Sequence, residues 1–250
     1  MNKKNKGFTL VELLVVIGIL GILMGALFPA ISSAMIKANL SACGMRGRNL
    51  FVAITAANTE REALGLGNVW AKTEAEEGAD SSTDPLGAGL GNSVDKYFQY
   101  LFDTEKMGTA DWKPYISGVD VSVLSGAGVP PAGDPKQLKG KNILWSIAAN
   151  VTDEVDDVVP VLVSRNFPVK KLTTDEYKGT GNEEFKLGTG GEAQFDTPFG
   201  NKAFVIIRKG GGVIQQTSKY ATEQVVYSKQ AFKIPKNEGA GEFQYLEPSK

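Results

Sequence analysis

Residues 8–28 form an apolar run that contains a single charged side chain, Glu12. As an α-helix, a run of this length spans about 30 Å, which is the thickness of the hydrocarbon core of a bilayer. The run follows Lys3, Lys4 and Lys6, and such a positive flank stays on the cytoplasmic side of a membrane. The sequence therefore predicts a single membrane-spanning helix at residues 8–28, with the rest of the chain outside the cytoplasm.

A cleaved secretory signal peptide and an uncleaved signal anchor are two ordinary explanations of such a run. A signal peptide has a shorter apolar core, followed by a cleavage site of small residues such as Ala-x-Ala. Here the run leads into Phe28, Pro29, Ala30 and Ile31, which is not that pattern. The uncleaved anchor stays open as the plain alternative.

Glu12 does not suit a plain anchor, because burying an ionised carboxylate in hydrocarbon is unfavourable. An acid within a membrane span indicates a functional site that needs a cationic partner. The apolar run offers no lysine or arginine after Gly7. A free amino group at Phe8 would supply the cation, but only if the chain were cut between Gly7 and Phe8.

The segment Gly7-Phe8-Thr9-Leu10-Val11-Glu12 resembles the prepilin signal of type IV pilins and type II secretion pseudopilins. The resemblance implies that a prepilin peptidase cuts after Gly7 and that Phe8 becomes the N-methylated terminus. It also implies that Glu12 is the assembly acid, which meets the terminal amine of a neighbouring subunit. Pro29 resembles the proline that kinks the stem helix in this family.

This resemblance implies a pilin-like α+β fold. In that fold a long N-terminal helical stem, with a membrane-spanning half and an amphipathic half, packs on a C-terminal antiparallel β-sheet head. The implied partners are copies of the chain or other pilins and pseudopilins, the prepilin peptidase, the inner-membrane assembly machinery and membrane lipid. The implied location is the inner (cytoplasmic) membrane as a single-pass protein, and then a periplasmic or extracellular filament.

Helical periodicity continues past Pro29 to about residue 63, where Gly65 and Gly67 stop it. Its apolar side recurs at steps of three and four residues: Ile36, Leu40, Cys43, Gly47, Leu50, Ile54 and Ala57. A polar stripe follows another side: Lys37, Ser41, Arg48, Thr55 and Glu62. We expect the apolar side to pack on the head, with Cys43 as an ordinary core residue. Gly44 and Gly47 indicate either a softer place in the helix or a close approach by another helix.

The predicted organisation is a leader at residues 1–7, a stem at 8–64 and a head at 65–250. Residues 65–92 and 125–140 are typical of loops, and a helix is expected from a cap at Asn92 or Ser93 to Gly108. Strands are predicted at residues 142–149, 158–164, 202–208, 213–217, 224–227 and 231–234, with a hairpin turn at 210–212. Residues 145–150, 160–166 and 198–200 also resemble C-terminal parts of large pseudopilin-like proteins.

Composition excludes several chemistries. The chain has no histidine and one cysteine, which excludes Ser–His–Asp and Cys–His catalysis, histidine metal sites and an internal disulfide. Its 27 basic and 28 acidic side chains leave no basic footprint, so no nucleic-acid partner is expected. Asp153, Glu154, Asp156 and Asp157 offer oxygen ligands of the kind that Ca²⁺ prefers, but not in EF-hand order. A plain acidic loop is therefore favoured over a calcium site, and no other cofactor is expected.

Three functions fit the anchor. A filament subunit explains the leader, Glu12 and the long stem together, and it is favoured. An anchored exported enzyme explains the anchor but not Glu12, and the sequence shows no catalytic set, so no enzymatic activity is predicted. An anchored head that binds a surface ligand through loops 65–92 and 125–140 is compatible with the first function.

Overall fold

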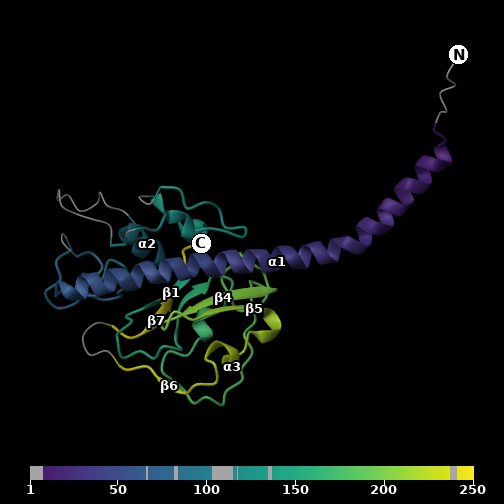
Figure 1. Ribbon diagram of the computed structural model, residues 1–250. Coiled ribbons are helices and arrows are strands. Elements are labelled where there is room, and N and C mark those ends of the chain that lie inside the picture. The colour runs from purple at the N-terminus through teal and green to yellow at the C-terminus, as the bar shows by residue number, and fades with distance from the viewer. Residues whose placement is uncertain are drawn as a thin grey trace. The chain divides into compact units, whose positions relative to one another are not determined.

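The computed structural model describes residues 8–65, 67–81, 84–102, 115–116, 118–134, 137–236 and 241–250. The chain divides into two compact units, Met1–Ala38 and Asn39–Lys250. Helix α1 (Leu10–Ala63) contributes to both units, and every other element belongs to the second, which we call the head unit (Figure 1). The division into a leader at 1–7, a stem at 8–64 and a head at 65–250 stays a prediction.

The long helix α1 confirms the long N-terminal helix of the predicted fold. Pro29 lies inside it, where a proline removes one backbone N–H from the helix ladder. Two serines after Pro29 bind the carbonyls on either side of it. The hydroxyl of Ser32 donates to Phe28 O (3.1 Å), and that of Ser33 donates to Ala30 O (2.9 Å). The kink at Pro29 stays a prediction.

The head unit contains an antiparallel sheet of five strands in the order β5-β4-β2-β1-β7. Its strands are β1 (Trp145–Ala149), β2 (Pro160–Ser164), β4 (Ala203–Arg208), β5 (Val213–Thr217) and β7 (Gln244–Leu246). The first four were predicted, and the hairpin turn between β4 and β5 is closed by a hydrogen bond from Gly211 N to Arg208 O (2.9 Å). Strand β1 begins later than predicted because Gly140–Asn142 forms a 3₁₀ turn.

Alternate residues of β4 point to opposite faces of the sheet, as the pleat requires. Ile207 lies on the face that packs against α1, beside Gly47. Phe204 points to the other face, where its ring lies 5.3 Å from that of Phe167. Arg208 points the same way and donates to the carbonyls of Val225 and Val226. Both faces of the central strands are therefore buried.

The strand predicted at residues 224–227 is wrong, because this segment forms the short helix α3 (Glu223–Val226). Val226 N and Tyr227 N donate to the carbonyls of Thr222 (2.9 Å) and Glu223 (2.8 Å), which are helical contacts. Arg208 then binds the carbonyls at the C-terminal end of α3. The strand predicted at 231–234 is shorter, β6 (Phe232–Lys233), and it pairs with β3 (Glu176–Tyr177), which was not predicted.

The part of α1 in the head unit packs against the sheet with its predicted apolar side inward, whereas Ile36, predicted on the same side, lies in the other unit and is half-buried. Leu40, Cys43, Gly47, Leu50, Ile54 and Ala57 are all buried, and the predicted polar stripe is exposed or half-buried. A Cβ atom at Gly44 would overlap the Gln215 side chain, and one at Gly47 would lie 2.6 Å from the Trp145 ring. The two glycines therefore mark a close approach, as one prediction held, but the partner is the sheet and not another helix.

Helix α2 (Val94–Phe102) begins at the predicted cap, where Ser93 Oγ accepts from Lys96 N (3.3 Å). Its core face is buried at Val94, Tyr97, Phe98 and Leu101. The predicted end at Gly108 lies outside the described residues. Asp95 in its first turn accepts hydrogen bonds from Gly140 N (3.1 Å) and from Ser249 N (3.2 Å), so α2 holds two distant segments together.

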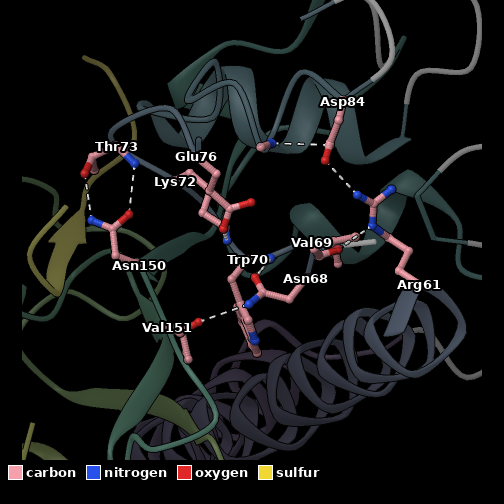
Figure 2. A network of polar contacts seen from close by, with 12 residues as sticks. Arg61, Asn68, Val69, Trp70, Lys72, Thr73, Glu76, Asp84, Asn150 and Val151 are labelled. Carbon is pink, nitrogen blue, oxygen red and sulfur yellow. Dashed lines mark hydrogen bonds and ion pairs between the residues drawn. The ribbon is translucent and has the colours of Figure 1, made fainter. Parts of the chain in front are cut away.

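Polar contacts fix the loop that follows α1 (Figure 2). Arg61, in the last turn of α1, pairs with Asp84 (2.8 Å) and donates to the carbonyl of Gly67 (2.7 Å). Asn150 binds the same loop at Thr73, through Thr73 N (3.0 Å) and Thr73 Oγ1 (2.7 Å). These contacts attach the described part of this predicted loop to the rest of the head unit at Gly67, Thr73 and Asp84, although it forms no helix.

Arg165 is a buried cation that is bound by neutral oxygen atoms. It is 4% exposed, and its Nη1 donates to the carbonyls of Gly140 (3.0 Å), Lys141 (3.1 Å) and Ile143 (3.0 Å). Its Nε donates to Thr197 Oγ1 (3.0 Å). These contacts join the end of β2 to the 3₁₀ turn that precedes β1.

Candidate functional site

The first turn of α1 is closed by Thr9 and Glu12. Thr9 directly precedes the helix, and its Oγ1 accepts a hydrogen bond from Glu12 N (3.2 Å). In return, Glu12 Oε2 accepts from Thr9 N (2.9 Å) and from the Thr9 hydroxyl (2.7 Å). This reciprocal pattern is a capping box, in which each residue satisfies a backbone N–H that the helix leaves without a partner.

The capping box turns the carboxylate of Glu12 back towards the start of the helix. It therefore points to the end of α1 that carries Phe8, whose side chain is 76% exposed. Gly7, the predicted cleavage residue, lies outside the described residues. Sequence reasoning assigned Glu12 to assembly and missed Thr9, although a threonine three residues before a glutamate at a helix start is a capping signal.

The apolar helix surface after Glu12 is uncovered within the described part of the chain. Every residue from 10 to 31 is exposed, including Leu10 (80%), Ile22 (75%) and Phe28 (73%). By length and composition, α1 is apolar enough to cross a membrane, as predicted for residues 8–28. Apolar surface of this extent needs lipid or other protein chains to cover it.

The acidic loop does not bring its four carboxylates together. Asp156 Oδ1 accepts from Val158 N (3.0 Å), while Lys209 Nζ occupies the carbonyls of Asp153 and Val155 (both 2.6 Å). Over the ranges that the structure describes, no group of three or more acidic, cysteine or histidine side chains is placed to hold a metal ion. The calcium hypothesis for Asp153, Glu154, Asp156 and Asp157 therefore gains no geometric support.

Cys43 is a core residue, as predicted. It is 2% exposed, and burial raises the pKa of its thiol to about 11, against the smaller opposing effect of Arg46. A thiol that stays protonated at neutral pH is a poor nucleophile and a poor metal ligand. The head unit therefore uses Cys43 for packing.

The long N-terminal helix and the five-stranded antiparallel sheet define an α+β, pilin-like architecture. Residues 2–28 match the family model described as the prokaryotic N-terminal methylation motif. This segment is thus the prepilin-type cleavage and methylation signal of type IV pilins and pseudopilins, which confirms the resemblance. No curated protein and no solved structure matches the chain. The signal is that of a prepilin peptidase substrate of the pilin or pseudopilin kind, which is consistent with an exported, membrane-anchored protein.

Proposed function

We propose that this chain is a structural subunit of a type IV pilus-like or type II secretion pseudopilus filament. Prepilin peptidase processes it between Gly7 and Phe8, and it then assembles through its N-terminal helix. One observation carries the proposal: residues 2–28 combine the methylation motif with an acid, Glu12, inside an otherwise apolar helix. We infer a structural role without enzymatic activity, because the signal is that of structural, pilin-like proteins.

Processing creates the cation that Glu12 lacks. Cleavage frees an ammonium group at Phe8, next to Thr9, and the Glu12 carboxylate is turned towards that end of the helix. Opposite charges attract more strongly in a medium of low dielectric constant than in water. The Phe8 ammonium of a neighbouring subunit therefore offsets the charge of Glu12 and fixes the axial position of one subunit against the next.

Assembly also covers the uncovered helix. Before assembly the inner membrane surrounds residues 8–28 while the basic leader stays in the cytoplasm and the head unit lies outside it. A filament subunit outside the bilayer needs other apolar helices in place of lipid around the exposed Leu, Ile and Val side chains. The partners are therefore copies of this chain or other pilins and pseudopilins, together with the inner-membrane assembly machinery.

The mature N-terminus tests the proposal. Mass spectrometry of the protein from membranes and from sheared filaments should give N-methyl-Phe8 as the first residue. Cells that lack the peptidase should keep the leader and form no filaments. A chain that keeps its leader in the presence of the peptidase would instead favour a signal-anchored protein whose head binds a surface ligand or carries another activity.

A further inference from the structure

Strand β5 forms one edge of the sheet, and alternate residues of it turn their backbone groups away from β4. The hydrogen bond from Ser218 N to Lys202 O (2.8 Å) shows which residues these are. In an antiparallel pair, hydrogen-bonded residues alternate with residues whose N–H and C=O groups point the other way. Counting back from Ser218, the even-numbered residues of β5 bond to β4. The outward-pointing residues are therefore Val213, Gln215 and Thr217.

The outward N–H groups of Val213, Gln215 and Thr217, with the carbonyls of Val213 and Gln215, form what we call the open edge. Within the described residues, none of these groups has a hydrogen-bond partner. Gln215 and Thr217 are exposed, and Val213 is half-buried. Proteins usually protect such an edge with a charge, a proline or a very short strand. The five residues of β5 include neither a charge nor a proline, whereas β7 at the opposite edge has three residues. The open edge is therefore available for another strand.

The β4–β5 hairpin and its surroundings are basic. Residues 197–222 contain no acidic side chain, although 28 of the 250 residues of the chain are acidic. Lys202 and Lys219 are exposed at the C-terminal end of β5. Near the other end, the exposed Arg48 of α1 donates to a carbonyl of the turn before β5 (3.1 Å). Asp157 lies beside that turn and accepts from it through its backbone carbonyl (2.9 Å). Positive charge therefore predominates along the open edge.

These features favour one kind of partner. Donors and acceptors at alternate residues match the backbone of an extended polypeptide, which pairs with a sheet edge as an added strand. The phosphates of a nucleic acid offer acceptors only, so they would leave the carbonyls of the open edge without a partner. Pairing between the open edges of two copies would bring Arg48, Lys202 and Lys219 against the same cations, which repel one another. An acidic extended strand meets both the hydrogen-bonding and the charge requirement.

We propose that the open edge binds an extended acidic segment of another polypeptide, which joins the sheet as an added strand next to β5. The backbone of that segment pairs with the outward groups of β5, and its carboxylates lie near Lys202 and Lys219. This binding site goes beyond the filament function, because one head unit supplies the whole of the open edge.

A fluorescently labelled peptide of the sequence Glu-Val-Thr-Val-Thr-Val-Glu tests the open edge directly. Its sequence is the same in both directions, so it can pair with β5 in a parallel or an antiparallel sense. Fluorescence anisotropy measures its binding to the full chain in detergent micelles. We expect saturable binding that weakens but persists as salt is added, because salt screens the attraction between charges and leaves the backbone hydrogen bonds in place. Absence of binding at millimolar peptide would overturn the proposal.

Two altered peptides separate backbone pairing from charge. N-methylation of the central Thr-Val-Thr removes N–H donors from both edges of the peptide and keeps its charge, so binding should be lost. Replacing both glutamates by glutamine keeps the backbone and should weaken binding. Equal binding of the N-methylated peptide would exclude strand addition, and equal binding of the glutamine peptide would exclude an acidic partner. A single-stranded oligonucleotide that displaces the peptide would assign this surface to nucleic acid instead. Each of these three results overturns the proposal.

Thr217→Pro tests the same contact from the side of the protein. The backbone of Thr217 has φ −80°, which proline adopts without strain, and its N–H is not bonded to β4. Losing this one donor should weaken peptide binding about three- to tenfold. Thr217→Ala is the matched control, since it keeps the N–H and should bind like the wild type. Urea unfolding checks that both variants are folded. Wild-type binding by a folded Thr217→Pro chain would overturn the proposal.

Discussion

Gly47 of helix α1 leaves room for the indole ring of Trp145: a Cβ atom at position 47 would lie 2.6 Å from Cη2 of that ring. Trp145 is fully buried, and its Nε1 donates to the carbonyl of Val123 (3.0 Å). On the other side, Ile207 Cγ1 would lie 2.9 Å from the same Cβ. The helix therefore approaches the sheet as closely as it does because position 47 has no side chain.

Gly47→Ala should destabilise the head by about 1–3 kcal/mol, since it overpacks a rigid contact. Gly44→Ala is the matched control, because its Cβ meets only the flexible side chain of Gln215. Both substitutions gain about 1 kcal/mol of helix propensity, so Gly44→Ala should be neutral or stabilising. Urea unfolding measures both, and equal effects would show that the approach at Trp145 is not the constraint.

Glu12→Gln and Glu12→Leu separate the two roles of this side chain. Glutamine keeps the capping box with Thr9 but removes the charge, whereas leucine removes both and suits the membrane better. Both variants should still be cleaved, and both should enter filaments poorly because the partner of the Phe8 ammonium is gone. Thr9→Val, which loses the cap and keeps the charge, should still assemble. The readout is the yield of sheared filaments against the membrane pool at equal expression; a wild-type yield from Glu12→Leu would remove the assembly role.

Gly7→Val should block processing. The residue before the cut is a glycine in front of a bulky apolar helix, and a larger side chain there should exclude the peptide from the peptidase. The precursor should stay in the membrane with the mass of its leader added, which immunoblotting and mass spectrometry detect. Normal processing of this variant would place the cleavage site elsewhere.

A fragment that lacks residues 1–35 should be soluble and monomeric, because it loses the uncovered apolar helix and keeps the entire compact unit Asn39–Lys250. It should unfold cooperatively, and reductant should not change the transition, since Cys43 has no second thiol to pair with. Aggregation, or loss of cooperative unfolding, would mean that the head needs its full stem or its neighbours to fold.

The buried thiol of Cys43 should resist alkylation in the folded head at pH 8 and react once urea unfolds it. Because burial raises the pKa of this thiol to about 11, the folded state holds its proton more tightly than the unfolded state does. The resulting stability is present below the ordinary thiol pKa and is lost as pH rises towards 11. Cys43→Ala should therefore lose less stability than the wild type between pH 8 and 11. An identical slope would argue against the raised pKa.

The stem, the β4–β5 hairpin and the core face of α2 could be predicted because each is determined by neighbouring residues. Strands β3 and β7 could not, since each is short and is held by a partner far along the chain, as Gln244 is by Ala149. The strand predicted at 224–227 had the right composition, with two valines and a tyrosine. In the fold it forms α3, and Arg208, a distant residue, binds the carbonyls at the end of that helix.

The candidate functional site shows the same limit, because contacts with residues far along the chain cannot be predicted from the local sequence. The spacing of Phe8 and Glu12 matches the prepilin signal, and their roles in processing and assembly stay predictions. Thr9 belongs to the same apolar run in the sequence, and its capping role is clear only where α1 is seen to begin. For the acidic residues 153–157 the sequence favours a plain acidic loop over a calcium site. In the fold, Lys209 binds the carbonyls between them, and only a distant part of the chain could supply that lysine.

Arg165 connects two parts of the head through hydrogen bonds to uncharged oxygen atoms. Its hydrogen bonds go to backbone carbonyls and to the hydroxyl of Thr197, none of which gains or loses a proton in the range where proteins fold. A carboxylate partner would weaken in acid, and an exposed ion pair would weaken as ions accumulate around it. The junction between β2 and the turn before β1 should therefore keep its strength over a wide range of pH and salt concentration, which suits the exported location proposed for the head.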